Sequence, residues 1–299
     1  MKIKLQFVQA TRRDFLKASG GLLAAATLSP DWLNATPAAP RNLKKAIMYG
    51  TVGFKGTVLE KLKAVQAAGF AGVEPMSHMD QAEVLRALEA TGLKAASVCC
   101  STHWKQPLSD PNPAVRQAGV DGLKQALRDA QRYGATSVLL VPGAVKAGVT
   151  YDDCWQRSIV EIRKVIPLAE ELNVRIAIEN VWNNFITKPE QAVAYIDEIN
   201  SPHVGWHFDI GNAIKYSPPE TWIATLGKRI VKIHFKEFSQ TKKFSVKFLE
   251  GDNNWPAIMQ ALDAVGYQGW GISEQPADQT KDAPSLKDFS ARLDRIFAS

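Results

Sequence analysis

The sequence is poor in the features that mark several classes of protein. It has three cysteines in 299 residues, Cys99, Cys100 and Cys154, and none forms a Cys-x-x-Cys pair, so neither a disulfide framework nor a thiolate zinc site is predicted. Beyond residue 40 the basic residues are scattered in runs of no more than two, such as Lys242-Lys243, which argues against a nucleic-acid partner. No Gly-x-Gly-x-x-Gly follows an apolar run, and no segment after residue 40 has the roughly 20 consecutive apolar residues of a membrane span.

The first 40 residues differ in character from the rest. Residues 11–17 read TRRDFLK, which resembles the twin-arginine export motif, and the weakly apolar stretch that follows at 18–28 is too short to span a bilayer. Small residues at 35–39 suit a cleavage site. We therefore expect residues 1–40 to be a twin-arginine signal peptide and linker, and residues 41–299 to be one exported domain. This predicts a periplasmic protein that the twin-arginine translocase carries across the membrane.

From about residue 45 the chain alternates between short apolar runs and amphipathic stretches. Apolar runs at 45–50, 69–75, 93–100 and 137–142 read as strands, with four more in the second half. Helical patterns lie between and after them, at 57–68, 80–90, 113–133, 152–172, 189–199, 219–226, 255–265 and 286–297. Eight strand–helix pairs of this length, with strands apolar throughout, predict a (β/α)8 TIM barrel. An open doubly wound sheet is the alternative fold.

The four strands of the second half each end on a residue type that binds metals. They are residues 176–180, 206–209, 230–234 and 270–274, and the metal-binding types are Glu179, Asp209, His234 and Glu274. A charged group at the end of a buried strand is costly unless something compensates it. In a barrel the active site lies at the C-terminal ends of the strands, and neighbouring strands are about 5 Å apart. Three carboxylates and one imidazole therefore predict a site for one divalent ion: Mn²⁺, Mg²⁺, Co²⁺ or Zn²⁺.

The same reasoning about strand ends places several other residues near the C-terminal end of the barrel, which we call the barrel mouth. Lys236 follows His234 on the same face and is expected either to stabilise an enediolate oxygen or to form a salt bridge with Glu237 or a neighbour. His207 shares a face with Asp209 and is expected either to bind substrate or to be a satisfied core histidine. The remaining residues expected to contact substrate at the ends of strands two, three and five are Glu74, His103, Trp104 and Trp182.

With these motifs the chain resembles the xylose isomerase-like TIM-barrel superfamily over nearly all of residues 45–298. The likeness rests on Ile-Glu-Asn around Glu179, Phe-Asp-Ile-Gly-Asn around Asp209, Ile-His-Phe-Lys-Glu around His234 and Ser-Glu-Gln-Pro around Glu274. The group contains sugar epimerases such as D-tagatose 3-epimerase, inosose dehydratases, hydroxypyruvate isomerases and AP endonucleases. Its relatives often form homodimers, and the sequence itself marks no interface.

The resemblance implies roles for particular residues. In the epimerases the matching Glu, Asp, His and Glu bind the metal, and the two glutamates move the substrate's proton, so Glu179 and Glu274 are expected to be the acid/base pair. Asn212 stands where epimerases and endonucleases commonly carry a histidine, and it is expected to hydrogen-bond a substrate hydroxyl. Further histidines that the endonucleases need are absent, which argues against DNA repair.

Three functions remain open at this point. The first is a metal-dependent sugar isomerase or epimerase that abstracts a proton beside a carbonyl and passes through a metal-bound enediolate. The second is a lyase that uses the same first step on a 3-keto-glycoside and then expels the β-oxygen. The third is a sugar-binding protein without catalysis. Export favours an unphosphorylated sugar or keto-sugar as the ligand.

Overall fold

The apolar runs of the sequence form the strands of a single parallel sheet. A computed structural model describes residues 41–299, so the predicted export signal at 1–40 lies outside the described residues. The strands are β1 (Leu43–Met48), β2 (Gly72–Glu74), β3 (Lys94–Ala95), β4 (Val98–Cys99), β5 (Ser137–Leu140), β6 (Arg175–Glu179), β7 (Val204–Asp209), β8 (Ile230–Phe235) and β9 (Gly269–Ser273). Their order in the sheet is β3-β2-β1-β9-β8-β7-β6-β5-β4.

β3 and β4, the strands at the two edges of the sheet, follow each other directly in the chain. The sheet therefore curves round until its two edges meet. The sequence analysis expected one strand at 93–100, but the structure has β3 paired with β2 and β4 paired with β5. The chain changes partner at Ala96 and Ser97, where the Ser97 hydroxyl donates to the backbone oxygen of Ser137. A parallel bridge between Met76 and Cys99 joins the two ends. β3 and β4 together take the place of one barrel strand. The nine strands therefore form the predicted eight-position TIM barrel, which is nearly closed.

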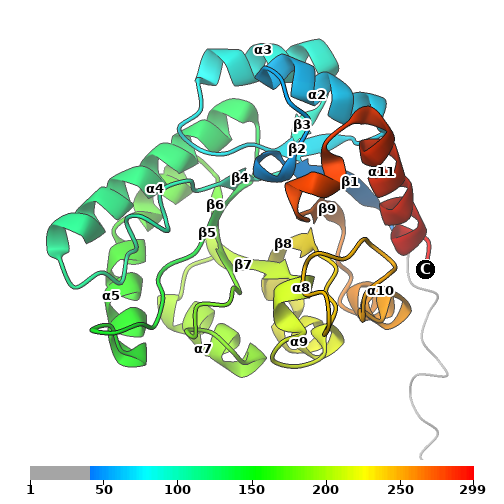
Figure 1. The fold of residues 1–299 in the computed structure, drawn as a ribbon. Coiled ribbons are helices and arrows are strands. Elements are labelled where there is room, and N and C mark those ends of the chain that lie inside the picture. Colours follow the sequence, from blue (N-terminus) through cyan, green and yellow to red (C-terminus); the bar gives the residue numbers. More distant parts are fainter. Residues whose placement is uncertain (1–40) are drawn as a thin grey trace, which may run out of the picture. The chain divides into compact units, whose positions relative to one another are not determined.

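Helices form an outer ring around the strands (Figure 1). They are α2 (Val58–Ala67), α3 (Gln81–Thr91), α4 (Pro113–Tyr133), α5 (Tyr151–Arg163), α6 (Ile166–Glu171), α7 (Pro189–Ile199), α9 (Pro219–Leu226), α10 (Trp255–Ala264) and α11 (Ala283–Phe297). The short helix α8 (Ile210–Ala213) lies instead at the end of β7, directly after Asp209. Their ends follow local chemistry. Thr57 and Glu60 form a capping box at the start of α2, and Gly134 ends α4 with a positive φ of 76°.

One predicted helix is divided in two. The sequence pattern indicated a single helix at 152–172, whereas the structure has α5 and α6 separated at Lys164 and Val165. Pro167 lies in the first turn of α6, where its missing N–H costs nothing, but inside a continuous helix it would remove a hydrogen bond and clash with the preceding turn.

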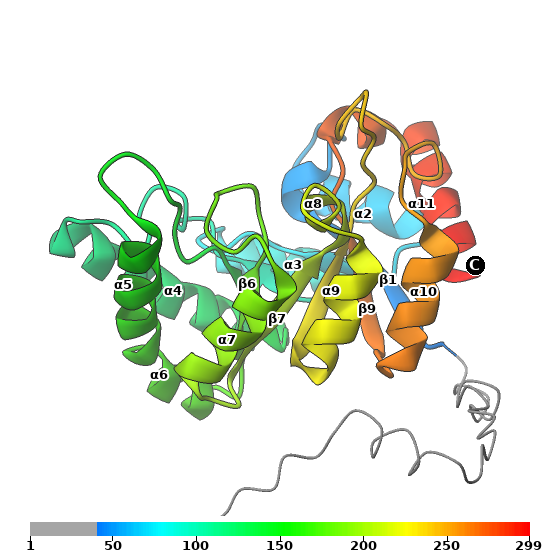
Figure 2. The same ribbon diagram turned by 90° about the horizontal axis from the view of Figure 1, so that it is seen from below.

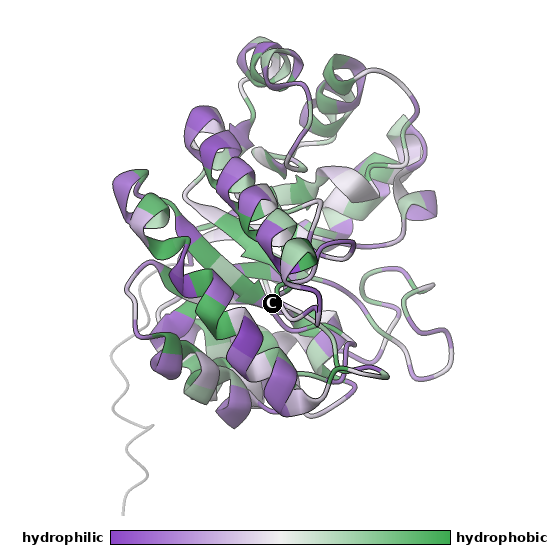
Figure 3. Cartoon of the chain, turned by 90° about the vertical axis from the view of Figure 1, so that its left-hand side faces the viewer, coloured by the Kyte–Doolittle hydropathy of each residue, from purple (hydrophilic) through white to green (hydrophobic). Residues whose placement is uncertain are grey.

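The hydrophobic core lies between the strands and the ring of helices. Figure 3 shows strongly hydrophobic strands and helices that carry hydrophilic residues as well. Leu62, Leu123, Ile162, Trp222 and Leu293 of five different helices are fully or almost fully buried in this layer. The view in Figure 2 shows the helices lying alongside the strands. Among the residues that the structure describes, no helix has the length and apolar character needed to cross a membrane.

Candidate active site

The four strand-end residues predicted as ligands come together at one end of the barrel. Glu179 and Asp209 are the last residues of β6 and β7, His234 is the last but one of β8, and Glu274 directly follows β9. Each offers one ligand atom, and the four atoms all lie within 4.8 Å of one another. Atoms bound to one ion at about 2.1 Å each lie at most about 4 Å apart, so a contraction of less than an ångström would complete a coordination shell.

His234 is the centre of this cluster. Its Nδ1 lies 3.0 Å from Glu179 Oε1, 3.4 Å from Glu274 Oε2 and 3.9 Å from Asp209 Oδ2. Its Nε2 lies 2.9 Å from Glu74 Oε2 on the opposite side of the ring. Burial alone would lower the pKa of His234, but the carboxylates around it, Glu74 foremost, hold that pKa well above its ordinary value.

The charges of the cluster suit a divalent cation. Four carboxylates, those of Glu74, Glu179, Asp209 and Glu274, face one ammonium and one imidazole, so the site is negative even when the imidazole is protonated. Burial raises the pKa of Asp209 to about 8, although the Lys236 charge opposes the shift. The buried Asp209 Oδ2 has no hydrogen-bond partner among residues 41–299. A carboxylate oxygen that lacks a hydrogen-bond partner, in a set of three carboxylates and one imidazole, fits a bound metal ion.

Asn180 holds the strand ends in place, and the sequence analysis did not single it out. Its side-chain oxygen accepts from the backbone N–H of Asp209 at 2.9 Å and from the Trp206 indole at 3.2 Å. Its amide donates to the backbone oxygen of Asp209 at 2.8 Å. The Asn212 amide, in turn, donates to the backbone oxygen of Asn180 at 3.1 Å. Asn180, next to Glu179, and Asn212, three residues after Asp209, therefore tie the end of β6 to the end of β7.

Lys236 belongs to the cluster rather than pairing with Glu237. Its ammonium lies 2.7 Å from Glu274 Oε2 and 3.5 Å from Asp209 Oδ2, and it sits 4.7 Å from the centre of the Phe244 ring. Glu237 points into the loop after β8 instead, where it accepts from the Trp255 indole at 2.7 Å and from the Leu249 backbone at 2.9 Å. Lys236 therefore forms its salt bridges with Glu274 and Asp209 of the cluster, and its role in a reaction stays a prediction.

A cavity of about 340 Å³ opens over the cluster. Of the residues expected near substrate, His103, Trp104, Trp182 and Asn212 line it, together with the ionic residues Glu179, His234, Lys236 and Glu274. One wall is apolar and consists of Met48, Met76, Cys99, Leu139 and Val181. The cavity lining therefore combines a group of ionic residues with a group of apolar residues that pack together.

The residues at the rim are held in definite orientations. The Nδ1 of His103 accepts from the Val141 backbone at 3.2 Å, and burial lowers the pKa of His103 to about 4, which leaves a neutral ring with Nε2–H as its donor. The Trp182 indole donates to the backbone oxygen of Asn212 at 3.0 Å. Trp104 has 58% of its surface exposed, and its ring packs edge-on against that of His103 with centroids 5.3 Å apart.

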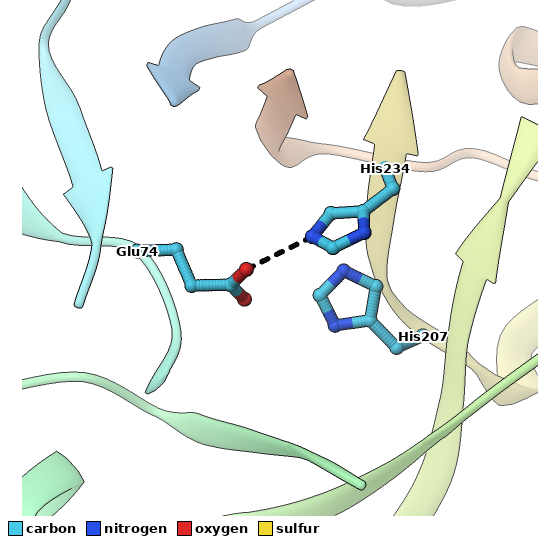
Figure 4. Close-up of side chains that lie close together, drawn as sticks. All are labelled: Glu74, His207 and His234. Atoms are coloured by element: carbon cyan, nitrogen blue, oxygen red, sulfur yellow. Dashed lines mark hydrogen bonds and ion pairs between the residues drawn. The ribbon is translucent and has the colours of Figure 1, made fainter. Parts of the chain in front are cut away.

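Glu74 and His207 are not among the residues that line the cavity. Their side chains lie close to His234 (Figure 4). Both are fully buried, and with His234 they form a second group whose ligand atoms lie within 4.8 Å of one another. The His207 ring packs edge-on against that of His234, with centroids 4.1 Å apart. Neither His207 nitrogen has a hydrogen-bond partner in the described part of the chain, so His207 is not the satisfied core histidine that was one of the two expectations.

The fold and the cluster together define a barrel protein with a candidate metal site at the C-terminal ends of its strands. The chain belongs to the xylose isomerase-like TIM barrel family, whose model matches residues 62–295. This confirms the family that the strand-end motifs indicated.

The chain is similar to several sugar epimerases. L-ribulose-5-phosphate 3-epimerase of Escherichia coli is 24% identical over 248 residues, which cover 78% of this chain and 87% of the relative. The fold is also that of 3-keto-D-glucoside 4-epimerase from E. coli, with a TM-score of 0.72, 16% identity, and coverage of 86% of this chain and 100% of the other. D-allulose 3-epimerase from Methylomonas sp. matches with a TM-score of 0.72 and 16% identity over 87% and 98% of the two chains.

Proposed function

We propose that the protein is a divalent-metal-dependent sugar epimerase or isomerase that moves a proton on a carbon next to a carbonyl group. The observation that carries this proposal is the convergence of Glu179, Asp209, His234 and Glu274 within 4.8 Å at the mouth of the barrel. The epimerase activities of the relatives support the same class of reaction. The oxygen-rich ligand set favours Mn²⁺, Mg²⁺, Co²⁺ or Zn²⁺.

The residues of the site can divide the reaction between them. A divalent ion held by the four strand-end residues would polarise the substrate carbonyl and so acidify the neighbouring C–H. Glu179 and Glu274 both reach the cavity, so one can take the proton and the other can return one. The Lys236 ammonium, fixed at 2.7 Å from Glu274 Oε2, supplies positive charge where the carbonyl oxygen becomes negative.

The cavity suits an unphosphorylated sugar or keto-sugar. Its lining contains one lysine, Lys236, and that ammonium is already paired with Glu274. A phosphate dianion would enter a site that is itself negative, which is unfavourable in a partly dry cavity. His103 and Asn212 offer N–H groups for hydroxyls, and Trp104 and Trp182 offer faces on which a sugar ring can stack.

The two other functions considered for this site have less support. A lyase acting on a 3-keto-glycoside would share the first proton transfer, but the structural neighbour that acts on a 3-keto-glucoside is an epimerase. A binding protein without catalysis needs neither an acid/base pair nor a buried lysine beside it. Export by the twin-arginine route and assembly as a homodimer stay predictions.

Hydrogen exchange with solvent tests the proposal. The Mn²⁺-loaded protein is incubated in D₂O with a panel of ketoses and 3-keto-glycosides, and the C–H next to the carbonyl is followed by NMR. We expect one deuterium at the carbon whose configuration changes, in both the remaining substrate and the product. Release of an aglycone or of water would instead indicate the lyase, and tight binding without any exchange would contradict catalysis.

A further inference from the structure

Glu74 reaches His234 from the far side of the barrel. It is the last residue of β2, whereas His234 lies on β8, and the two strands are separated in the sheet by β1 and β9. The Glu74 side chain is fully buried and is absent from the residues that line the cavity. The sequence analysis expected it to contact substrate, but the structure directs its carboxylate to the imidazole instead (Figure 4).

The two nitrogens of His234 face different partners. Nε2 lies 2.9 Å from Glu74 Oε2, and Nδ1 faces the three carboxylates of the candidate metal site, the nearest being Glu179 at 3.0 Å. Without a cation, each nitrogen can donate a hydrogen to the carboxylate that it faces. A cation among Glu179, Asp209 and Glu274 would need the lone pair of Nδ1, and Nε2 would then keep the hydrogen that Glu74 accepts. In the neutral ring this leaves the lone pair on Nδ1, directed at Glu179, Asp209 and Glu274.

We propose that Glu74 is a positioning residue that fixes the Nε2–H tautomer of His234 and thereby presents Nδ1 as the metal ligand. This assignment rests on the metal site of the proposed function. Histidines that bind metals commonly donate their other ring N–H to a carboxylate, which orients the ring and strengthens the ligand. His207 helps to hold the same orientation, because its ring packs against that of His234 at a centroid distance of 4.1 Å.

Metal affinity is the first measurement. Wild type, Glu74→Gln and Glu161→Gln are stripped of metal and titrated with Mn²⁺ by calorimetry. Glu161 is a matched control, because it is a glutamate with 4% exposure that is paired with Arg116 and Lys164 in the helical layer. We expect Glu74→Gln to weaken Mn²⁺ binding by about 10- to 100-fold, while Glu161→Gln stays within about twofold of wild type.

The tautomer itself is the second measurement, and it needs no variant that could misfold. The wild-type protein, with ¹⁵N-labelled histidine and loaded with diamagnetic Zn²⁺, is examined by long-range ¹H–¹⁵N NMR. We expect a protonated Nε2 and a metal-bound Nδ1 in His234. A protonated Nδ1, or a Glu74→Gln protein that folds and binds Mn²⁺ as tightly as wild type, would overturn the assignment. A wild type that binds no Mn²⁺ would overturn the proposed function as well.

Discussion

Replacing Glu274 with Gln is expected to lower kcat by about 10²- to 10⁴-fold, the usual range for the loss of a general acid or base. The change keeps the size of the side chain but removes a negative charge that lies 2.7 Å from the Lys236 ammonium and 3.4 Å from His234 Nδ1. Glutamine cannot accept the substrate's proton. Initial rates and deuterium exchange are measured at rising Mn²⁺ concentrations, so that weakened metal binding is separated from loss of proton transfer.

Glu89→Gln provides the control for this substitution. Glu89 is an exposed residue of α3, so the same chemical change there leaves the site untouched and should leave kcat unchanged. Circular dichroism shows whether Glu274→Gln keeps the fold. More than a tenth of wild-type kcat in a folded, metal-saturated Glu274→Gln protein would remove Glu274 from the acid/base pair.

Removing the metal is expected to abolish activity and to lower the melting temperature. The cluster has four carboxylates against Lys236 and His234, so without a cation its buried negative charge is only partly compensated. A ligand present at 100 times its Kd stabilises the folded state by about 2.7 kcal/mol. For a domain of this size that corresponds to roughly 5 to 10 °C in Tm. Scanning calorimetry before and after chelation measures the shift.

Asp209→Asn separates this effect from unspecific stabilisation by ions. The variant removes the ligand with the unpartnered Oδ2, so its Tm should respond little to Mn²⁺, whereas wild type should regain both Tm and activity when Mn²⁺ is restored. Equal responses of the two proteins, or full activity of chelated wild type, would mean that the cluster does not hold the metal.

The ligand set could be predicted from the sequence because of the topology of the barrel. Parallel strands joined by helices all end at the same mouth, so residues at equivalent strand ends are neighbours in space even when they are far apart in the chain. Glu179, Asp209, His234 and Glu274 occupy such positions, and their convergence follows from strand counting alone. Lys236 was placed by the same alternation.

Other features of the site depend on contacts that no local pattern records. Glu74 lies 160 residues from His234, and either residue alone is compatible with several partners. Asn180 acts through bonds to the backbone of Asp209, which its sequence neighbourhood does not indicate. The division at Ala96 and Ser97 arises from the curvature of the closing sheet, although Pro167 did provide a readable signal for the break between α5 and α6.

The most direct test is the anomalous diffraction of a crystal of this protein soaked with Mn²⁺. The account predicts one strong peak at the mouth of the barrel, bonded at about 2.1 to 2.3 Å to side-chain atoms of Glu179, Asp209, His234 and Glu274, with Nδ1 as the ligand atom of His234. A peak elsewhere in the molecule, or a peak at the mouth that leaves two of these residues unbound, would contradict it.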